Sequence, residues 1–434
     1  MRKFMLITLA VLLVGQIGFA QVAPNSAVQQ FVRAQVTGKA QPVMPAVAPG
    51  THARSLAMFS GQKLSAKSSS IKAASAPGEP WFCDWNNGSQ VLVCPKGVQT
   101  AYGTNFPGVN GGAGMTVAIV DAFYYLDAEN ALAQYNADMG LPPCTVANGC
   151  FTPVDMSNGN QCISCYGWEV ETMLDIEAVH AMAPNAKIVY IGSDPYNYSQ
   201  AEEILAQSVA VVTSNSWTFN ASEGVAPIFE PALGQGPPTL FASGDYGYFP
   251  YSGISYPCTS SKAVCVGGTS LYLNPNLTRN AETGWSGSGG GCSGYFGIPS
   301  WQSGYGFGST VCSPNRATPD ISAIADPNTA FAVYIGGNYA GYYYGIGGTS
   351  LATPINAGLI ADIDAARVSF GKPLLTYANF NSEMYAAANS NYNYFVFDIT
   401  SGNNGYPAGL KFDRVTGLGV PNGKNVSNRF FGLP

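Results

Sequence analysis

Residues 115–120 have the sequence MTVAIV, and this short apolar run with β-branched side chains predicts a buried strand. The next apolar positions, which share one face of a predicted helix, are Ala128, Ala131, Leu132 and Tyr135. Gly140 and Pro142 end that helix. A strand followed directly by a helix predicts one βα unit.

Similar units follow along the chain. The sequence predicts helices at residues 169–182 and 202–208, and short apolar strands at 187–191, 209–213, 239–242 and 263–266. This alternation predicts an α/β fold, an open parallel sheet with helices on both faces, in one domain of about 350 residues. In such sheets the functional residues gather beyond the carboxyl ends of the strands, which directs attention to Asp121, residues 214–217 and Asp245.

The composition excludes several classes of protein. The chain has 434 residues, and the 46% that are hydrophobic provide a sizeable core and argue against disorder. Only 10% of the residues are charged and the net charge is −6, without a basic stripe, so nucleic acid is excluded as a partner. Histidine occurs only twice, which restricts proton-transfer chemistry near neutral pH.

The amino-terminal region predicts export. Residues 1–20 combine two basic residues, a short apolar run and a small-residue cleavage point, as a signal peptide does. Residues 21–80 are rich in Ala, Ser, Gln and Pro and predict a flexible leader or short propeptide before a folded part at 81–434. We therefore expect a secreted protein, extracellular or periplasmic, that has no membrane association once the signal peptide is removed. Ten cysteines predict five disulfides, and we interpret the CxxC at 162–165 as structural.

A candidate nucleophile lies in the segment GGTSLATP at residues 347–354, which precedes a run with helical spacing at 355–366. Pro354 is tolerated near a helix start, which places Ser350 at or just before the first turn. Unpaired backbone N–H groups at that position can help to bind an oxyanion. The alternative is that Ser350 only caps the helix.

Neither histidine is a good candidate for the base that a serine nucleophile needs. His52 lies in the predicted leader. His180 lies on the predicted helix 169–182, and a lone histidine on a helix is more often structural than catalytic. The base is therefore sought among the acidic residues.

Two acidic residues on the same predicted helix form a candidate pair. Glu171 and Asp175 are four positions apart and share one face, whereas His180 points to about the opposite side. Two close carboxylates repel each other unless they share a proton, and such a pair keeps one carboxylate available as a base in mild acid. The alternative is an ordinary solvated face, which the nearby Glu169 and Glu177 favour. A third acid, Asp245, follows the strand 239–242 and can also be interpreted as a turn aspartate.

At this point the sequence resembles the sedolisin family of serine-carboxyl peptidases over about residues 96–425. The segments that carry the resemblance, in order, are VAIVD (117–121), residues 171–175, SNSW (214–217), SGD (243–245), VGGTS (266–270), GGGCS (289–293), PDIS (319–322) and GGTS (347–350). The resemblance implies a subtilisin-like fold and a monomeric endopeptidase that acts on polypeptides in acid. It implies that Ser350 is the nucleophile and Glu171 the general base. Asp175 would orient Glu171, and a protonated Asp245 would donate to the oxyanion.

The resemblance also implies one structural Ca²⁺ ion near the carboxyl terminus. The residues at the matching positions are Asp398, Ile399, Gly409, Lys411 and Asp413. Two carboxylates and several main-chain carbonyls form a hard oxygen cage suited to Ca²⁺. Relatives usually have glycine at the position of Lys411, and they usually carry a long folded prodomain where this chain has a short leader.

Two other functions remain open from the sequence. The first is a histidine-dependent subtilisin-like protease, which would depend on His180. The His-Gly-Thr motif of that class is missing from this sequence. The second is a catalytically inactive secreted binding protein on the same fold.

Overall fold

The structure is a computed structural model, and it describes residues 53–55, 57–65, 85–86, 89–90, 92–104, 110–195, 200–219, 222–248, 255–307 and 309–430. The predicted signal peptide at 1–20 lies outside these residues. None of the helices within these ranges is both long enough and apolar enough to cross a membrane.

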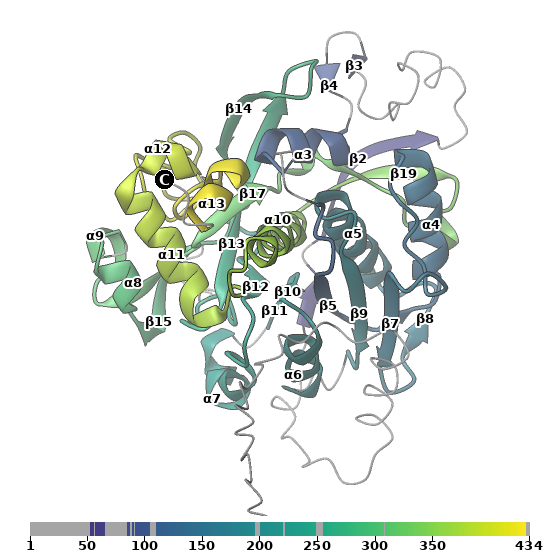
Figure 1. Cartoon of the computed structure of the whole chain (residues 1–434), viewed down its shortest axis with the longest axis horizontal. Coiled ribbons are helices and arrows are strands. Elements are labelled where there is room, and N and C mark those ends of the chain that lie inside the picture. Colours follow the sequence, from purple (N-terminus) through teal and green to yellow (C-terminus); the bar gives the residue numbers. More distant parts are fainter. Residues whose placement is uncertain are drawn as a thin grey trace, which may run out of the picture.

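A mixed, mostly parallel sheet forms the centre of the molecule (Figure 1). Its order is β14 (Arg279–Gly284), β13 (Val264–Leu273), β12 (Thr239–Ala242), β10 (Val212–Asn215), β5 (Thr116–Ala122), β9 (Lys187–Ser193) and β7 (Phe151–Met156), and β17 (Ile321–Ile324) also pairs with β13. All pairs are parallel except β13 with β14. The predicted α/β fold class is therefore confirmed.

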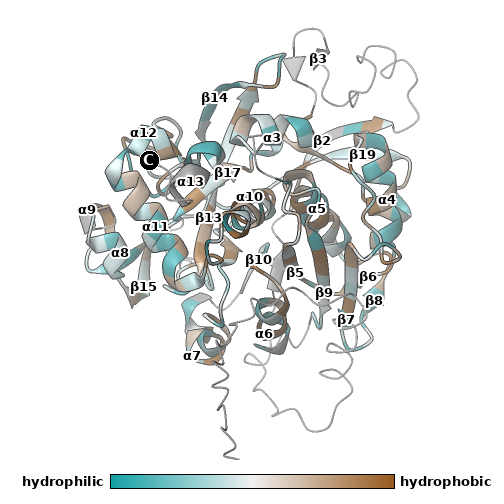
Figure 2. Cartoon of the chain, in the orientation of Figure 1, coloured by the Kyte–Doolittle hydropathy of each residue, from teal (hydrophilic) through white to brown (hydrophobic). Residues whose placement is uncertain are grey.

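Burial explains why the strands read as continuous apolar runs. All seven residues of β5 are buried, so both faces of this strand are covered by other elements. Two long helices, α5 (Trp168–Met182) and α10 (Thr349–Ser369), pack against each other, and α10 also crosses β10, β12, β13 and β17. Figure 2 shows hydrophobic colour along both helices and along the strands beneath them. These two helices carry Glu171, Asp175 and Ser350.

Part of the predicted leader belongs to two small antiparallel sheets. β1 (Ala53–Ser55) pairs with β11 (Trp217–Phe219). β2 (Met58–Ser65) lies beside β19 (Tyr342–Gly347), which also pairs with β18 (Phe331–Val333), in a three-stranded sheet (Figure 1). The boundary at residue 80 between leader and folded part stays a prediction.

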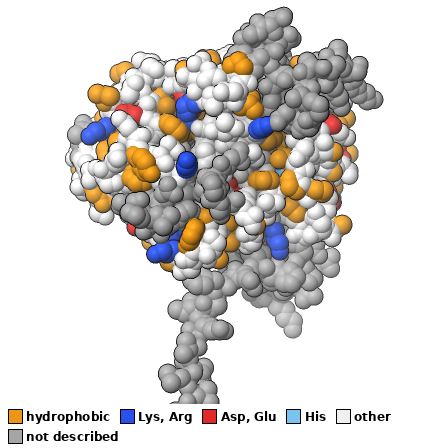
Figure 3. Space-filling model, turned by 45° about the horizontal axis from the view of Figure 1, so that its top comes forward, with side chains coloured by type: hydrophobic (Ala, Val, Ile, Leu, Met, Phe, Trp, Pro, Cys, Tyr) orange, Lys and Arg blue, Asp and Glu red, His pale blue; other side chains and the backbone are white. Residues whose placement is uncertain are grey.

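The remaining helices and strands surround this centre. The helices are α3 (Pro95–Tyr102), α4 (Ala128–Met139), α6 (Gln200–Val209), α7 (Ala226–Phe229), α8 (Ser300–Ser303), α9 (Ser309–Cys312), α11 (Tyr377–Ser390), α12 (Tyr392–Phe395) and α13 (Gly423–Phe430). The short strands are β3 (Trp85–Asn86), β4 (Ser89–Gln90), β6 (Tyr124–Tyr125), β8 (Gln161–Cys162), β15 (Gly291–Gly297), β16 (Asn315–Thr318), β20 (Val396–Phe397) and β21 (Val420–Pro421). Figure 3 shows only scattered charged side chains on one face, as expected from the low charged content.

Four disulfides join cysteines that are close in sequence: Cys144–Cys150, Cys162–Cys165, Cys258–Cys265 and Cys292–Cys312. Cys94 is also disulfide-bonded. No cysteine of the described part is free, and Cys162 and Cys165 form the disulfide that the structural interpretation of this CxxC requires.

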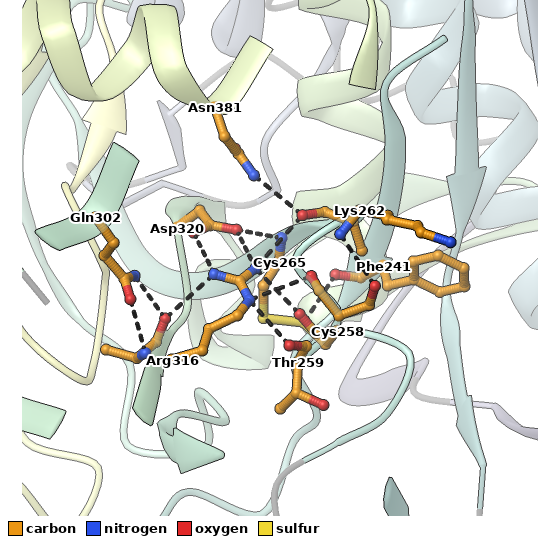
Figure 4. Close-up of polar contacts among 12 residues, drawn as sticks. Phe241, Cys258, Thr259, Lys262, Cys265, Gln302, Arg316, Asp320 and Asn381 are labelled. Carbon is orange, nitrogen blue, oxygen red and sulfur yellow. Dashed lines mark hydrogen bonds and ion pairs between the residues drawn. A yellow bond between two sulfur atoms is a disulfide. The ribbon is translucent and has the colours of Figure 1, made fainter. Parts of the chain in front are cut away.

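A buried ion pair between Arg316 and Asp320 holds the loop at residues 258–265, which leads into β13 (Figure 4). The guanidinium of Arg316 lies 2.8 Å and 3.0 Å from the two carboxylate oxygens of Asp320, and both side chains are completely buried. Arg316 also donates to carbonyl oxygens of the loop closed by the Cys258–Cys265 disulfide, and Asp320 accepts from the Cys265 N–H at 2.8 Å. One arginine therefore satisfies several main-chain acceptors that the fold removes from water.

Candidate active site

The two predicted acidic residues of α5 are buried. Glu171 and Asp175 are both inaccessible to solvent, as are nearly all side chains on this helix. The solvated-face interpretation is therefore wrong. Glu169 accepts hydrogen bonds from the Cys165 and Gly167 N–H groups, and Glu177 accepts from the Tyr334 N–H, so these two acids have structural partners in the core.

Ser350 lies in the first turn of α10, which begins at Thr349. The predicted place of Ser350 at the first turn is confirmed, but the helix begins earlier than the predicted run at 355–366, so Pro354 lies inside α10. Proline has no N–H to donate to the carbonyl four residues earlier, which is that of Ser350. The Ser216 hydroxyl, 3.1 Å away, is placed to donate to this carbonyl instead. The helix therefore continues through the proline.

Ser216 connects the two long helices, and sequence reasoning missed this role. Its hydroxyl lies 2.7 Å from Asp175 Oδ1 on α5, and its carbonyl oxygen accepts from the Ser350 hydroxyl at 3.3 Å. Its position just beyond the carboxyl end of β10 was the available signal, but nothing in the sequence indicates which neighbours it contacts.

Asp245 follows β12 and is tied to the residue beside Ser350. Its Oδ1 accepts from the Thr349 N–H at 2.7 Å and from the Thr349 hydroxyl at 2.8 Å. Its Oδ2 is buried and has no hydrogen-bond partner among the described residues. The interpretation as an ordinary turn aspartate is therefore wrong, since Asp245 binds the start of a helix far away in sequence.

The buried carboxyl groups have pKa values above those of exposed carboxyl groups, so they keep their protons to higher pH. Burial, and secondly the charge of Glu171, raises the pKa of Asp121 well above its ordinary value. Burial, then the charges of Asp121 and Glu171, does the same to the pKa of Asp175. Burial raises the pKa of Asp245 to about 8, against the effect of the two Thr349 hydrogen bonds. Such a cluster keeps at least one proton in mild acid.

His180 lies in a different place. One ring nitrogen, Nε2, is 2.9 Å from the Pro142 carbonyl oxygen, and the other has no partner among the described residues. Burial lowers the pKa of His180. The ring is close to the sulfur atoms of Cys144 and Cys150, but the disulfide between them leaves no thiolate for a metal. The structure gives no support to His180 as the base for Ser350.

The predicted calcium ligands lie around the turn at residues 409–413. Asp398 accepts from the Lys411 N–H at 3.0 Å, and Asp413 accepts from the Gly409 N–H at 2.9 Å, so both carboxylates face the same turn. The carbonyl oxygens of Ile399, Gly409 and Lys411 accept no hydrogen bond from any described residue. Lys411 has a left-handed backbone with φ of 63° and is exposed, so its side chain is not buried in the turn. Two carboxylates with unpaired carbonyls fit a hard cation such as Ca²⁺.

Two short strands of the predicted leader, β1 and β2, lie beside the candidate site. Ser55 at the end of β1 lies opposite Trp217, next to Ser216, and Met58 at the start of β2 lies opposite Gly347, three residues before Ser350. Between them the Ala57 N–H donates to Glu171 Oε2 at 2.8 Å. The backbone of residues 53–55 and 57–58 therefore lies next to elements that carry Glu171, Ser216 and Ser350.

Buried carboxyl groups with raised pKa values also predict how stability depends on pH. Burial raises the pKa of Asp121, Asp175, Glu177, Glu203, Asp245, Asp362 and Asp364. The folded state therefore binds more protons than the unfolded state from about pH 4 upward, and stability falls as pH rises through this window. The lowered pKa of His180 acts in the opposite direction below about pH 6.5 but is a single group.

We expect the melting temperature at pH 5 to exceed that at pH 8, as measured by circular dichroism. Glu203→Gln removes one titrating group of α6, whose pKa is about 7, and should reduce the difference between the two pH values. A melting temperature that rises from pH 5 to pH 8 would contradict the conclusion that burial raises the pKa values of these carboxyl groups.

Several known proteins are similar to this chain in sequence or in structure. No protein-family model matches the chain. Kumamolisin of Bacillus sp. (strain MN-32) is 30% identical over 367 residues, which cover 76% of this chain and 62% of kumamolisin. Sedolisin of Pseudomonas sp. (strain 101) is 35% identical over 219 residues, 45% of this chain and 34% of sedolisin. Tripeptidyl-peptidase 1 of Rattus norvegicus is 30% identical over 223 residues, 45% of this chain and 37% of the rat protein.

A solved structure extends the similarity to the fold. Pseudomonas sedolisin, described as a serine-carboxyl proteinase complexed with two molecules of pseudo-iodotyrostatin, matches with a TM-score of 0.64 and 24% identity. The match covers 77% of this chain and 97% of that structure. The chain spans less than two thirds of the length of each of the three relatives named above. On these similarities, and on the order of its motifs, the chain belongs to the sedolisin family of serine-carboxyl peptidases.

Proposed function

We propose that the chain is a secreted serine-type endopeptidase that hydrolyses polypeptides in acid. The observation that carries the proposal is the Ala57 N–H, between β1 and β2, which donates to Glu171 Oε2 at 2.8 Å. A peptide substrate bound in the same way has β11 on one side and the end of β19 on the other, and both strands offer main-chain hydrogen bonds. A buried carboxylate at the amide nitrogen is placed to exchange a proton with it.

In the proposed mechanism Ser350 attacks the peptide carbonyl. Its hydroxyl donates to the Ser216 carbonyl in this structure. The hydroxyl group therefore has to rotate before Glu171 accepts its proton. Glu171 then passes this proton to the departing amide nitrogen. Asp175 lies 2.7 Å from the Ser216 hydroxyl. It would orient Glu171 and balance its charge by taking up or releasing a proton.

Asp245 has the properties of an oxyanion donor. Its pKa of about 8 keeps it protonated in acid, and its Oδ1 is held by Thr349. The proton is therefore available on Oδ2, the oxygen without a described partner, for the oxygen that becomes negative in the tetrahedral intermediate. The Ser350 N–H in the first turn of α10 is the second donor that we assign to it.

The endopeptidase proposal is tested with Ser350→Ala. Wild-type protein should degrade denatured casein at pH 4, and the variant should show no activity above background, because nothing else supplies the nucleophile. Ser369→Ala, at the far end of the same helix, is the matched control and should keep full activity. Residual activity in Ser350→Ala comparable to wild type would contradict the proposal, as would a wild-type protein that cleaves no polypeptide between pH 3 and 8.

We further propose that the turn at 409–413 binds one structural Ca²⁺ ion. Asp398 and Asp413 would provide carboxylate oxygens, and Ile399, Gly409 and Lys411 their carbonyl oxygens. The ion would stabilise the turn by neutralising two carboxylates whose pKa values are raised by burial.

Calcium should therefore stabilise the folded protein. At a calcium concentration 100 times the dissociation constant, the gain is about 2.7 kcal/mol in the free energy of unfolding. We expect the melting temperature of chelator-treated protein to rise by several degrees as CaCl₂ is added, and Asp413→Asn to lose this response. Asp138→Asn, at a half-buried acid on α4 that accepts from Gln134 and Tyr343 and contacts no residue of this turn, should keep it. A wild-type melting temperature that does not change with calcium would rule out the site.

A further inference from the structure

The loop that carries Asp245 is held by a glycine-rich part of the chain. This oxyanion loop (residues 243–248) lies against the glycine segment (residues 284–291, sequence GWSGSGGG). Two main-chain hydrogen bonds join them on either side of Asp245, from the Gly247 N–H to the Gly287 carbonyl at 2.9 Å and from the Gly289 N–H to the Gly244 carbonyl at 2.8 Å. A shift of the glycine segment therefore moves the oxyanion loop with it.

Glycine is needed in this segment because other backbones approach it too closely for a side chain. A Cβ atom at Gly289 would collide with the Ser243 carbonyl oxygen, and a Cβ atom at Gly290 would collide with the Arg414 carbonyl oxygen. The glycine segment thus contacts the oxyanion loop on one side and the chain at Arg414 on the other. Closely packed contacts of this kind transmit small displacements.

Two buried polar side chains fix the glycine segment in turn. The Ser288 hydroxyl is completely buried, donates to the Val415 carbonyl at 2.7 Å and accepts from the Gly268 N–H of β13 at 2.8 Å. The Asn404 amide nitrogen donates to the Ser288 carbonyl at 2.7 Å and to the Arg414 carbonyl at 3.1 Å. These side chains therefore join the glycine segment to the central sheet and to the chain at 414–415.

Asn404 also contacts the oxyanion loop directly. Its carbonyl accepts from the Tyr248 N–H at 2.6 Å, and its amide oxygen accepts from the Tyr406 N–H at 3.1 Å. Because Asn404 is buried, a main-chain group that loses this partner is left without a hydrogen bond. Asn404 thus holds the oxyanion loop in two ways, through its own backbone at Tyr248 and through Ser288 in the glycine segment.

We infer that Asn404 and Ser288 are positioning residues that keep the Asp245 carboxyl group aimed at the oxygen that becomes negative during peptide hydrolysis. Thr349 holds only Oδ1 of Asp245, so the place of Oδ2 depends on the backbone of the oxyanion loop. The inference rests on the proposed function, in which Asp245 donates to the oxyanion, and it adds the residues that hold this donor. A donor of this kind acts in the transition state, so its displacement should lower kcat and leave KM nearly unchanged.

The experiment compares wild type with Asn404→Ala and Ser288→Ala, and uses Asn381→Ala as the matched control. Asn381 is also buried, and its amide donates to the Ala263 carbonyl, outside the oxyanion loop and the glycine segment. With a peptide substrate at pH 4 we expect kcat to fall at least about 10-fold in Asn404→Ala and in Ser288→Ala, with KM within about a factor of two. Asn381→Ala should keep both constants within about a factor of two of wild type.

A second measurement does not depend on the fraction of active protein. When a peptide aldehyde binds, the Ser350 oxygen bonds to its carbonyl carbon, the carbonyl π bond breaks and the Ser350 proton passes to Glu171. The former carbonyl oxygen then takes the place of the oxyanion, whereas the peptide alcohol of the same sequence forms no such bond. In Asn404→Ala the inhibition constant of the aldehyde should rise at least about 10-fold and that of the alcohol should not change.

Asp245→Ala tests whether Asn404 acts through Asp245. In the Asp245→Ala background, Asn404→Ala should raise the aldehyde inhibition constant by less than about a factor of two, because the donor that Asn404 positions is already absent. Two independent effects would instead multiply, and that result would overturn the inference. Ser288→Ala removes a single oxygen atom, so it keeps the test decisive if Asn404→Ala does not fold.

The outcomes separate this inference from the proposed function. Wild type that cleaves peptides while Asn404→Ala and Ser288→Ala match its kcat overturns the inference and leaves the endopeptidase proposal standing. An equal loss of kcat in Asn381→Ala, or aldehyde and alcohol constants that rise together, overturns the inference as well. Wild type that cleaves no polypeptide overturns the proposed function itself.

Discussion

Glu171→Gln should lower kcat/KM for peptide hydrolysis at pH 4 on the order of 10³-fold or more. The substitution keeps the size of the side chain and leaves an oxygen that can accept from the Ala57 N–H. It removes a carboxylate in contact with that nitrogen that can take up a proton and return it. A neutral amide in place of the carboxylate should therefore leave binding in place and lower kcat much more than it changes KM.

The matched control is Glu203→Gln. Glu203 is also completely buried on a helix, its pKa is also raised by burial, and it contacts Gln207 and Thr213 rather than the candidate site. We expect its kcat/KM to stay within a factor of two of wild type. Equal losses in the two variants would mean that the Glu171 effect is a general consequence of changing a buried acid.

Arg316→Met should destabilise the protein by about 3–5 kcal/mol, because it leaves the Asp320 carboxylate buried without its cation. The loop carbonyls that Arg316 satisfies, including those of Cys258 and Thr259, would lose their donors at the same time. The measurement is urea unfolding at pH 5 under non-reducing conditions, so that the Cys258–Cys265 disulfide stays closed.

Arg414→Met provides the comparison. Arg414 stacks over the Tyr406 ring and is not fully buried, so we expect a change below about 1 kcal/mol. A loss in Arg316→Met no larger than in Arg414→Met would show that the ion pair of Figure 4 does not hold the loop.

The sequence predicts the elements well where local patterns and burial agree. The strand 239–242 has the predicted bounds, and the helix predicted at 169–182 begins one residue earlier, because apolar spacing and tight turns define both. The strand predicted at 209–213 is wrong at its start, since Val209 ends α6 and β10 begins at Val212. An apolar residue at a boundary fits either element, and only packing decides between them.

The site was less predictable than the fold. Ser350, Glu171 and Asp175 are prominent by residue type and spacing, but Ser216 is one serine among many until the structure shows it between Asp175 and Ser350. The strand at 58–65 was also missed, because the surrounding polar composition is typical of a flexible leader. Its order comes from pairing with β19, nearly 280 positions later in sequence, which no local pattern reports.

The central claim is that a carboxyl cluster, and not histidine, activates Ser350, and the pH profile of kcat/KM tests it most directly. We predict a maximum in acid and a loss of activity as pH rises, no later than about pH 8, where Asp245 gives up its proton. His180→Ala should show the same profile, because His180 contacts the Pro142 carbonyl and not Ser350. Activity that is absent at pH 4, appears as an imidazole loses its proton near pH 6.5, and depends on His180 would contradict the account.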